Sequence, residues 1–108
     1  MPLIKLRYEI YIPTCYNDKT LIEVSKYREI KNKLQKKFGG LSVHPATIQG
    51  SFFSEILNCF LYDNCFRYEI LVEKLPENEE FFEEFKKELL QMLNQEEIFM
   101  IYTETNWV

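Results

Sequence analysis

Hydrophobic and polar residues alternate in two segments of the chain, residues 4–12 and residues 66–72. In both segments apolar side chains occupy the even positions, and charged or polar side chains fill most of the odd ones. A period of two places successive side chains on opposite faces of a strand, so that one face is buried and the other exposed. These segments therefore predict two half-buried β-strands.

Two other segments repeat apolar residues at spacings of three and four, which is the stripe of an amphipathic helix. The first stripe consists of Tyr27, Ile30, Leu34 and Phe38, and the second consists of Phe82, Phe85, Leu89 and Leu93. Gly39 follows the first stripe directly and predicts a left-handed C-cap. The start of this helix has two candidate caps, because Thr20 with Glu23 fits a capping box and Ser25 fits the cap of a shorter helix.

The remaining segments predict two more strands and one ambiguous region. Residues 41–44 alternate in polarity before Pro45, whose missing N–H confines this strand to a sheet edge or a bulge. Residues 98–103 are apolar on both faces and predict a last strand. Residues 47–62 fit a small β-hairpin, and a short helix is the alternative there.

The predicted order is strand, helix, strand, strand, helix, strand, in a single domain over residues 1–108. Two βαβ-type crossovers in a chain of this length indicate a ferredoxin-like α+β sandwich. We expect a four-stranded antiparallel sheet with both helices on one face and room for an extra hairpin around residues 47–62. The first and third strands are then central and the second lies at an edge, in agreement with Pro45.

Composition and charge exclude several classes of function. Thirteen Lys and Arg against seventeen Asp and Glu give a net charge of -4, which disfavours nucleic acid as a partner. The chain has neither an apolar run long enough for a membrane span nor the apolar core of a signal peptide at its start. Three cysteines without a Cys-x-x-Cys pair predict reduced thiols, no metal, no cofactor and a cytoplasmic location.

The expected topology brings distant loops to one rim of the sheet. The ends of the first two strands and the starts of the last two meet there, and they carry Cys15, Tyr16, Asn17, Asp18, His44, Asp63, Cys65, Gln95 and Glu96. Polar loops on a rigid sheet often bind or react, although ordinary loops are polar as well. The predicted binding site consists of these rim residues other than Cys65 and Glu96, together with Tyr11 and Glu69 on the uncovered sheet face.

His44 is the one histidine and the leading candidate for acid–base chemistry, because imidazole titrates near neutral pH. Beside Cys15 it would activate a thiolate, and with three thiols it would match the ligand count of zinc. The spacing of Cys59 and Cys65 is not that of a zinc site, and no nucleophile signature surrounds Cys15. A hydrogen-bonded structural histidine is the simpler interpretation.

The two predicted helices carry opposite charge. Residues 23–38 hold six Lys or Arg against two Glu, whereas residues 77–97 hold eight Glu against two Lys. These charges suit the helix dipoles and a solvated surface, or they steer a partner or a second copy of the chain.

Several short motifs resemble a family of short uncharacterised bacterial proteins. The motifs are Phe38-Gly39-Gly40-Leu41-Ser42-Val43, Gln49-Gly50, Leu61-Tyr62-Asp63, Glu69 and Gln95-Glu96-Glu97-Ile98, within residues 8–102. That family reads Phe-Gly-Gly-Leu-Thr-Val, a Gly followed by Trp, an acidic central strand and Gln-Glu-x-Ile, whereas Phe52 and Phe53 stand here in place of the Trp. The resemblance implies a ferredoxin-like fold in a cytosolic bacterial protein, and it implies no particular activity.

Taken together, the sequence predicts a small cytoplasmic binding module, homodimeric, that recognises a small ligand or a protein partner through the rim and the open sheet face. One alternative is a small hydrolase or nucleotide-processing enzyme that uses His44 and polar rim groups. Another is an interaction or antitoxin-like subunit that acts through its helix charges. The chain has neither a Gly-rich phosphate loop nor paired metal carboxylates to favour the enzyme.

Overall fold

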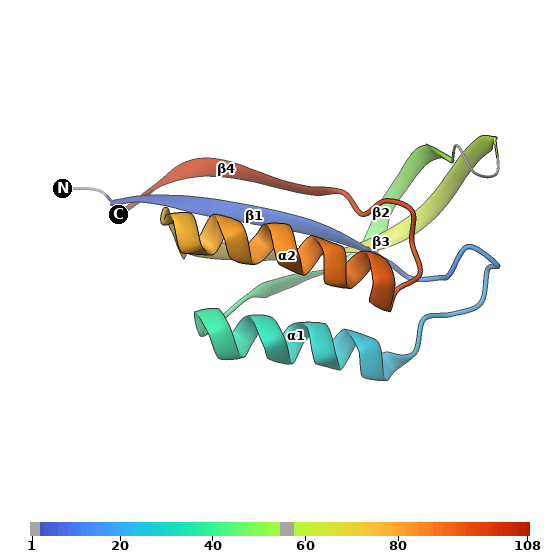
Figure 1. Cartoon of the computed structure of the whole chain (residues 1–108), viewed down its shortest axis with the longest axis horizontal. Coiled ribbons are helices and arrows are strands. Elements are labelled where there is room, and N and C mark those ends of the chain that lie inside the picture. Colours follow the sequence, from blue (N-terminus) through green and yellow to red (C-terminus); the bar gives the residue numbers. More distant parts are fainter. Residues whose placement is uncertain (1–2, 55–57) are drawn as a thin grey trace.

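The fold is a four-stranded antiparallel sheet in the order β2-β3-β1-β4 with two helices on one face, seen in the computed structural model in Figure 1. The elements in chain order are β1 (Leu3–Pro13), α1 (Val24–Phe38), β2 (Ser42–Ser54), β3 (Cys59–Glu73), α2 (Pro76–Met92) and β4 (Met100–Trp107). The structure describes residues 3–54 and 58–108, and the side chains of residues 4–44, 58 and 64–108. The predicted ferredoxin-like α+β arrangement is confirmed, with β1 and β3 central and β2 at an edge.

The pairing of the central strands sorts their side chains onto two faces. Tyr8 lies opposite Ile70 and Ile10 opposite Tyr68, and all four belong to one core with the helices. The buried apolar residues of this core are Leu6, Tyr8, Ile10, Ile12, Ile22, Ile30, Leu34, Tyr68, Ile70, Val72, Phe82, Phe85, Leu89, Leu93 and Ile98. The even positions of both alternating segments and most of both helical stripes therefore build the core, as their periodicity predicted.

Helix α1 ends as predicted but begins differently. Gly39 adopts a left-handed conformation with φ 86°, and its N–H donates to the carbonyl of Gln35 at 2.7 Å. The N-cap is Glu23, and no side chain caps the helix, so neither predicted cap is present. The carboxylate of Glu23 instead accepts a hydrogen bond from Tyr16, and Thr20 donates to Asp18.

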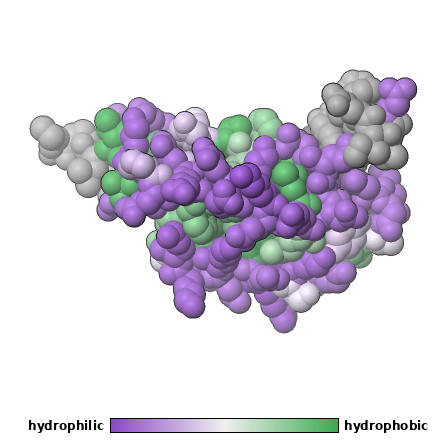
Figure 2. All heavy atoms as spheres, in the orientation of Figure 1, coloured by the Kyte–Doolittle hydropathy of each residue, from purple (hydrophilic) through white to green (hydrophobic). Residues whose placement is uncertain are grey.

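The opposite charges of the two helices meet within the molecule. Lys33 on α1 forms an ion pair with Glu88 on α2, and Lys26 donates to the carbonyl of Met92 at 2.9 Å. A cation beside the last carbonyls of a helix also stabilises the helix dipole. Figure 2 shows hydrophilic side chains over most of the visible surface, with hydrophobic residues between them. Neither helix in the described part of the chain is long and apolar enough to cross a membrane.

Pro45 lies in an edge strand beside an irregularity of pairing, as its missing N–H predicted, and the strand does not end there. β2 continues to Ser54 and stays paired with β3. A register shift between His44 and Ile48 accommodates the proline, because unpaired residues on the bulged strand need no ladder N–H.

The hairpin expected around residues 47–62 is confirmed by antiparallel pairing, and it continues β2 and β3 rather than forming a separate element. Its arms are the distal parts of β2 and β3, which form a ribbon that extends past the other strands in Figure 1. The turn at residues 55–57 lies outside the described residues.

The last strand is also displaced from its expected range of residues 98–103. β4 begins at Met100 and ends at Trp107, and most of its residues are exposed or half-buried. Ile98 is buried ahead of the strand, while the carbonyl of Phe99 accepts a hydrogen bond from the Tyr11 N–H at 3.0 Å. The apolar run therefore reflects packing of the segment after α2, and the expectation of a strand apolar on both faces is wrong.

Replacement of Leu89 by alanine tests the assignment of α2 to the core. Leu89 is fully buried, so we expect Leu89→Ala to lower the free energy of unfolding by about 2–5 kcal/mol in urea denaturation. The matched control is Leu21→Ala, at a residue that is 77% exposed, for which the change should stay within about 0.5 kcal/mol. Equal losses in the two variants would contradict the core assignment.

Candidate functional site

The face of the sheet opposite the helices gathers charged side chains from three strands. The residues between them in sequence, such as Tyr8, Ile10 and Ile70, point into the core, so the odd positions project to the other face. We call the charged and polar group there the open-face cluster, which consists of Arg7, Glu9, Tyr11, His44, Arg67 and Glu69. Because both helices pack on the far side, this cluster is accessible without any opening of the core.

Glu69 on β3 links the other two strands of the cluster. Its Oε2 lies 3.2 Å from Nε2 of His44 on β2, and its Oε1 lies 3.9 Å from Nε of Arg7 on β1. The Glu69 side chain is 25% exposed and that of His44 is 40% exposed. His44 therefore points away from the core, as the alternation predicted, and it has a carboxylate partner.

A second carboxylate, Glu9, lies directly opposite Glu69 in the pairing of β1 with β3. Two like charges at such positions repel each other. Arg7 reduces this cost, since its guanidinium lies 3.9 Å from Glu9 as well as from Glu69, and the Tyr11 hydroxyl donates to Glu9 at 3.3 Å. The result is a pair of carboxylates concentrated on one uncovered surface.

The two arginines of the cluster have unused hydrogen-bonding capacity. Nε of Arg7 and Nε of Arg67 are buried and make no hydrogen bond within the described part of the chain. Buried donors are nearly always paired in folded proteins. The cluster offers both charge signs to a ligand because the guanidinium group of Arg7 and the carboxylates of Glu9 and Glu69 lie on the same face.

An aromatic pair borders the cluster. The ring of Tyr11 lies 5.3 Å from that of Phe99, centroid to centroid, and Phe99 is 60% exposed. An exposed ring beside charged groups offers an apolar surface on which a flat heterocycle can stack.

The loop from β1 to α1 holds its own side chains in local contacts. Tyr16 donates to Glu23, and this hydrogen bond lowers the pKa of the Glu23 carboxyl. Asp18 accepts from the N–H of Thr20 at 2.9 Å and from its hydroxyl, and the hydroxyl contact lowers the pKa of Asp18. Asn17 lies between them in the same loop. These residues order the loop rather than join the open-face cluster.

The other predicted site residues lie in the core, in the ribbon and in the loop directly after β1. Gln95 is buried, and its side-chain amide donates to the carbonyl of Leu93 at 3.0 Å. The side chain of Asp63 lies outside the described residues. Cys15 accepts a weak hydrogen bond from the Thr14 hydroxyl at 3.8 Å, whereas His44 contacts Glu69. Of the predicted site, the structure brings together Tyr11, His44 and Glu69.

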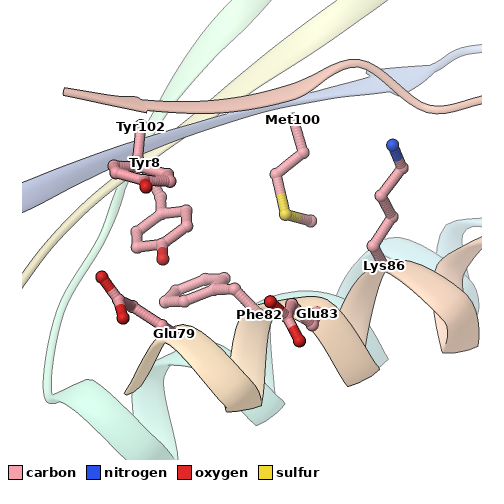
Figure 3. Close-up of a pocket in the computed structure, with 7 residues that line it drawn as sticks. All are labelled: Tyr8, Glu79, Phe82, Glu83, Lys86, Met100 and Tyr102. Carbon is pink, nitrogen blue, oxygen red and sulfur yellow. The ribbon is translucent and has the colours of Figure 1, made fainter. Parts of the chain in front are cut away.

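A pocket of about 260 Å³ opens between α2 and β4 on the helix-covered side (Figure 3). It is lined by Tyr8, Glu79, Phe82, Glu83, Lys86, Met100 and Tyr102. The rings of Tyr8 and Phe82 stack at 3.7 Å between centroids, and the Met100 side chain hangs toward them from β4. Periodicity assigned Tyr8 and Phe82 to the core and did not reveal this pocket, because Tyr102 meets Tyr8 only through the pairing of β1 with β4.

Burial raises the pKa of Tyr8 to about 12, and the nearby charges of Glu79 and Glu83 act in the same direction. Both causes disfavour the phenolate, since it would be poorly solvated and close to other negative charge. The carboxylates of Glu79 and Glu83 therefore make the electrostatic potential at the Tyr8 hydroxyl more negative.

Comparison with known proteins adds one structural likeness. No family model and no curated protein matches the chain, so the resemblance to short bacterial proteins stays a prediction. A phage SAM lyase in complex with S-methyl-5'-thioadenosine has a similar structure, with a TM-score of 0.67 and 14% sequence identity over 96% of this chain and 84% of that chain. Similarity at this identity shows a shared fold.

The raised pKa of Tyr8 predicts a loss of stability in alkali. The unfolded chain ionises this phenol from its ordinary pKa of 10.0 while the folded chain holds it neutral to about 12, so the free energy of unfolding falls as the pH rises through that window. Between a pH below 10 and the middle of this window, the free energy of unfolding should fall by about 1 kcal/mol less in Tyr8→Phe than in the parent. Tyr11→Phe, at a phenol on the opposite face of the sheet, is the control, and the free energy of unfolding of this variant should fall in alkali as in the parent. The same fall in Tyr8→Phe as in the parent would show the prediction to be wrong.

Proposed function

We propose that this chain binds a nucleoside of the S-adenosylmethionine class on the open-face cluster. The observation that carries the proposal is Glu69, a partly exposed carboxylate on a sheet face without helices, placed between His44 and Arg7. The fold it shares with a phage SAM lyase in complex with S-methyl-5'-thioadenosine supports this ligand class.

The charges of the cluster complement those of S-adenosylmethionine. That molecule carries a sulfonium and an ammonium cation together with one carboxylate. Glu9 and Glu69 supply two adjacent negative groups for the cations, and the guanidinium of Arg7, whose side chain is 42% exposed, suits the carboxylate. A ligand with only one sign of charge would leave either the carboxylates or the guanidinium group of Arg7 without an oppositely charged partner on the ligand.

The aromatic border of the cluster suits the adenine. Phe99 is exposed beside Tyr11, and a base stacked on such a ring gains roughly 1–3 kcal/mol regardless of its hydrogen-bonding edge. Adenine would lie over Phe99 while the sulfonium group reaches Glu69. This arrangement retains Tyr11, His44 and Glu69 as binding residues, and it retains the cytoplasm, where thiols stay reduced, as the location.

The same residues support the enzymatic alternative to a binding module. His44 and Glu69 are proton acceptors 3.2 Å apart and would lie next to the bound sulfonium. In this reaction one of the two takes a proton from the carbon next to the one bonded to sulfur, and the electrons of that C–H bond form a carbon–carbon double bond. The bond from sulfur to the amino-acid chain breaks with its electron pair on sulfur, so the products are S-methyl-5'-thioadenosine and an unsaturated amino acid. Chromatography of a reaction mixture with S-adenosylmethionine separates the two functions, because an enzyme accumulates this thioether and a binding module leaves the substrate unchanged.

Loss of the Glu69 charge tests the binding proposal. In titration calorimetry, Glu69→Gln should weaken the binding of S-adenosylmethionine about tenfold, since a charge contact near a protein surface contributes on the order of 1 kcal/mol or more. The uncharged S-methyl-5'-thioadenosine should lose much less affinity. Glu73→Gln, the same substitution at an exposed position on the same strand and face, is the control. Absence of binding by the parent, or equal effects of the two variants, would refute the proposal.

Self-association through the open face completes the proposal. Three large apolar side chains are exposed there, Leu71 at 38%, Phe99 at 60% and Trp107 at 46%. Exposed apolar groups that flank a polar centre commonly mark a surface that a partner covers. A homodimer would cover Leu71 and Trp107 while Phe99 and the charged centre stay available to a ligand.

The dimer is tested by sedimentation at high micromolar concentration. We expect a dimeric parent and a monomeric Leu71→Asp variant, because a buried unpaired carboxylate opposes association. Leu21→Asp, at a residue that is 77% exposed in the loop between β1 and α1, should remain dimeric. A monomeric parent would exclude the homodimer without affecting the ligand proposal, which calorimetry tests separately.

A further inference from the structure

The pocket between α2 and β4 combines an apolar floor with an acidic mouth. Tyr8, Phe82 and Met100 form the floor, and Glu79 and Glu83 come from successive turns of α2 (Figure 3). Neither of these carboxylates forms a hydrogen bond or an ion pair within the described part of the chain.

The lysines near the pocket have partners of their own. Nζ of Lys86, which lines the pocket, lies 2.8 Å from Oε1 of Glu97, and this contact lowers the pKa of Glu97. Lys74 pairs with Glu104 on β4. Neither lysine forms an ion pair with Glu79 or Glu83, although the charge of Glu79 acts on Lys74, so both carboxylates remain available to a cation in the pocket.

We propose that this pocket binds a small organic cation with one flat apolar ring, of the arylalkylamine class. The ring would lie against Tyr8, Phe82 and Met100, and the ammonium group would reach Glu79 or Glu83 at the mouth. A volume of about 260 Å³ is below that of most drug-sized ligand sites and suits a single ring with a short side chain.

Two further features favour a cation over a neutral or anionic ligand. Tyr102 stands at the mouth with its ring 5.2 Å from that of Tyr8, and aromatic rings attract cations through their electron-rich faces. The carboxylates also act on the Tyr8 phenol, whose pKa they help to raise, so their field extends into the pocket. The carboxylates of Glu79 and Glu83 would repel an anionic ligand.

The pocket is independent of the open-face cluster. Tyr8 and Met100 point to the helix side of the sheet, whereas Glu9 and Glu69 project from the other side. A ligand in the pocket contacts no residue of the open-face cluster, and a ligand on the cluster contacts no residue of the pocket. Failure of one ligand to bind therefore says nothing about the second.

Titration of the protein with three ligands of matched shape tests the proposal. Phenethylamine, phenylethanol and phenylpropanoate share a ring and differ in charge, and binding is followed by the NMR shift of the Met100 methyl group. We expect the amine to bind at least about tenfold more tightly than the alcohol, as one charge contact implies, and the anion not to bind. Equal binding of amine and alcohol, or no shift of the Met100 methyl group with the amine, would overturn the proposal.

Charge-removing variants identify the groups responsible. Glu79→Gln and Glu83→Gln should each weaken the binding of phenethylamine several-fold, and the double variant should weaken it about tenfold. The affinity for phenylethanol should stay unchanged in all three variants. Glu80→Gln is the matched control, because Glu80 is exposed on the same helix and does not line the pocket. Equal weakening by Glu80→Gln would show a general charge effect and would overturn the assignment of the site.

Discussion

The structure depends on the pairing of β1 with β3. In this register Tyr8 lies opposite Ile70 and Glu9 lies opposite Glu69, so each pair belongs wholly to one face. A slip of one residue would turn the apolar set toward solvent and the carboxylates and arginines toward the helices, at a cost that no local contact could offset. Core formation and the assembly of the open-face cluster are thus two results of one hydrogen-bonded ladder.

Packing of the helices distributes the charge of the molecule. Lys33 and Lys26 on α1 are engaged by Glu88 and by the end of α2, so much of the opposite charge on the helices is compensated internally. The acidic residues at the other flank of α2 face β4 instead, where Glu79 and Glu83 border the pocket. The charge asymmetry read from the sequence consequently has a third explanation, contact between the helices, besides solvation and partner steering.

The sheet separates two surfaces with different chemistry. On one side, carboxylates and arginines lie close together on an uncovered surface and suit a ligand that carries both charge signs. On the other, aromatic and thioether groups lie beneath carboxylates without ion-pair partners in the described part of the chain and suit a single cation on an apolar body. Because β1 contributes Glu9 to one side and Tyr8 to the other, its alternation sets the polarity of both surfaces.

Local patterns in the sequence were sufficient for the elements, their order and the two faces of the central strands, because periods of two and of three to four residues report burial directly. They also predicted the outward direction of His44 and the cap at Gly39. Pairing across strands was decided only in the tertiary structure: it made Glu69, 25 residues away in sequence, the partner of His44, and it carried β2 past Pro45. The pocket at Tyr8 likewise needed β4 to lie beside β1, and such long-range registers have no local signature, since they depend on which segments meet when the chain folds.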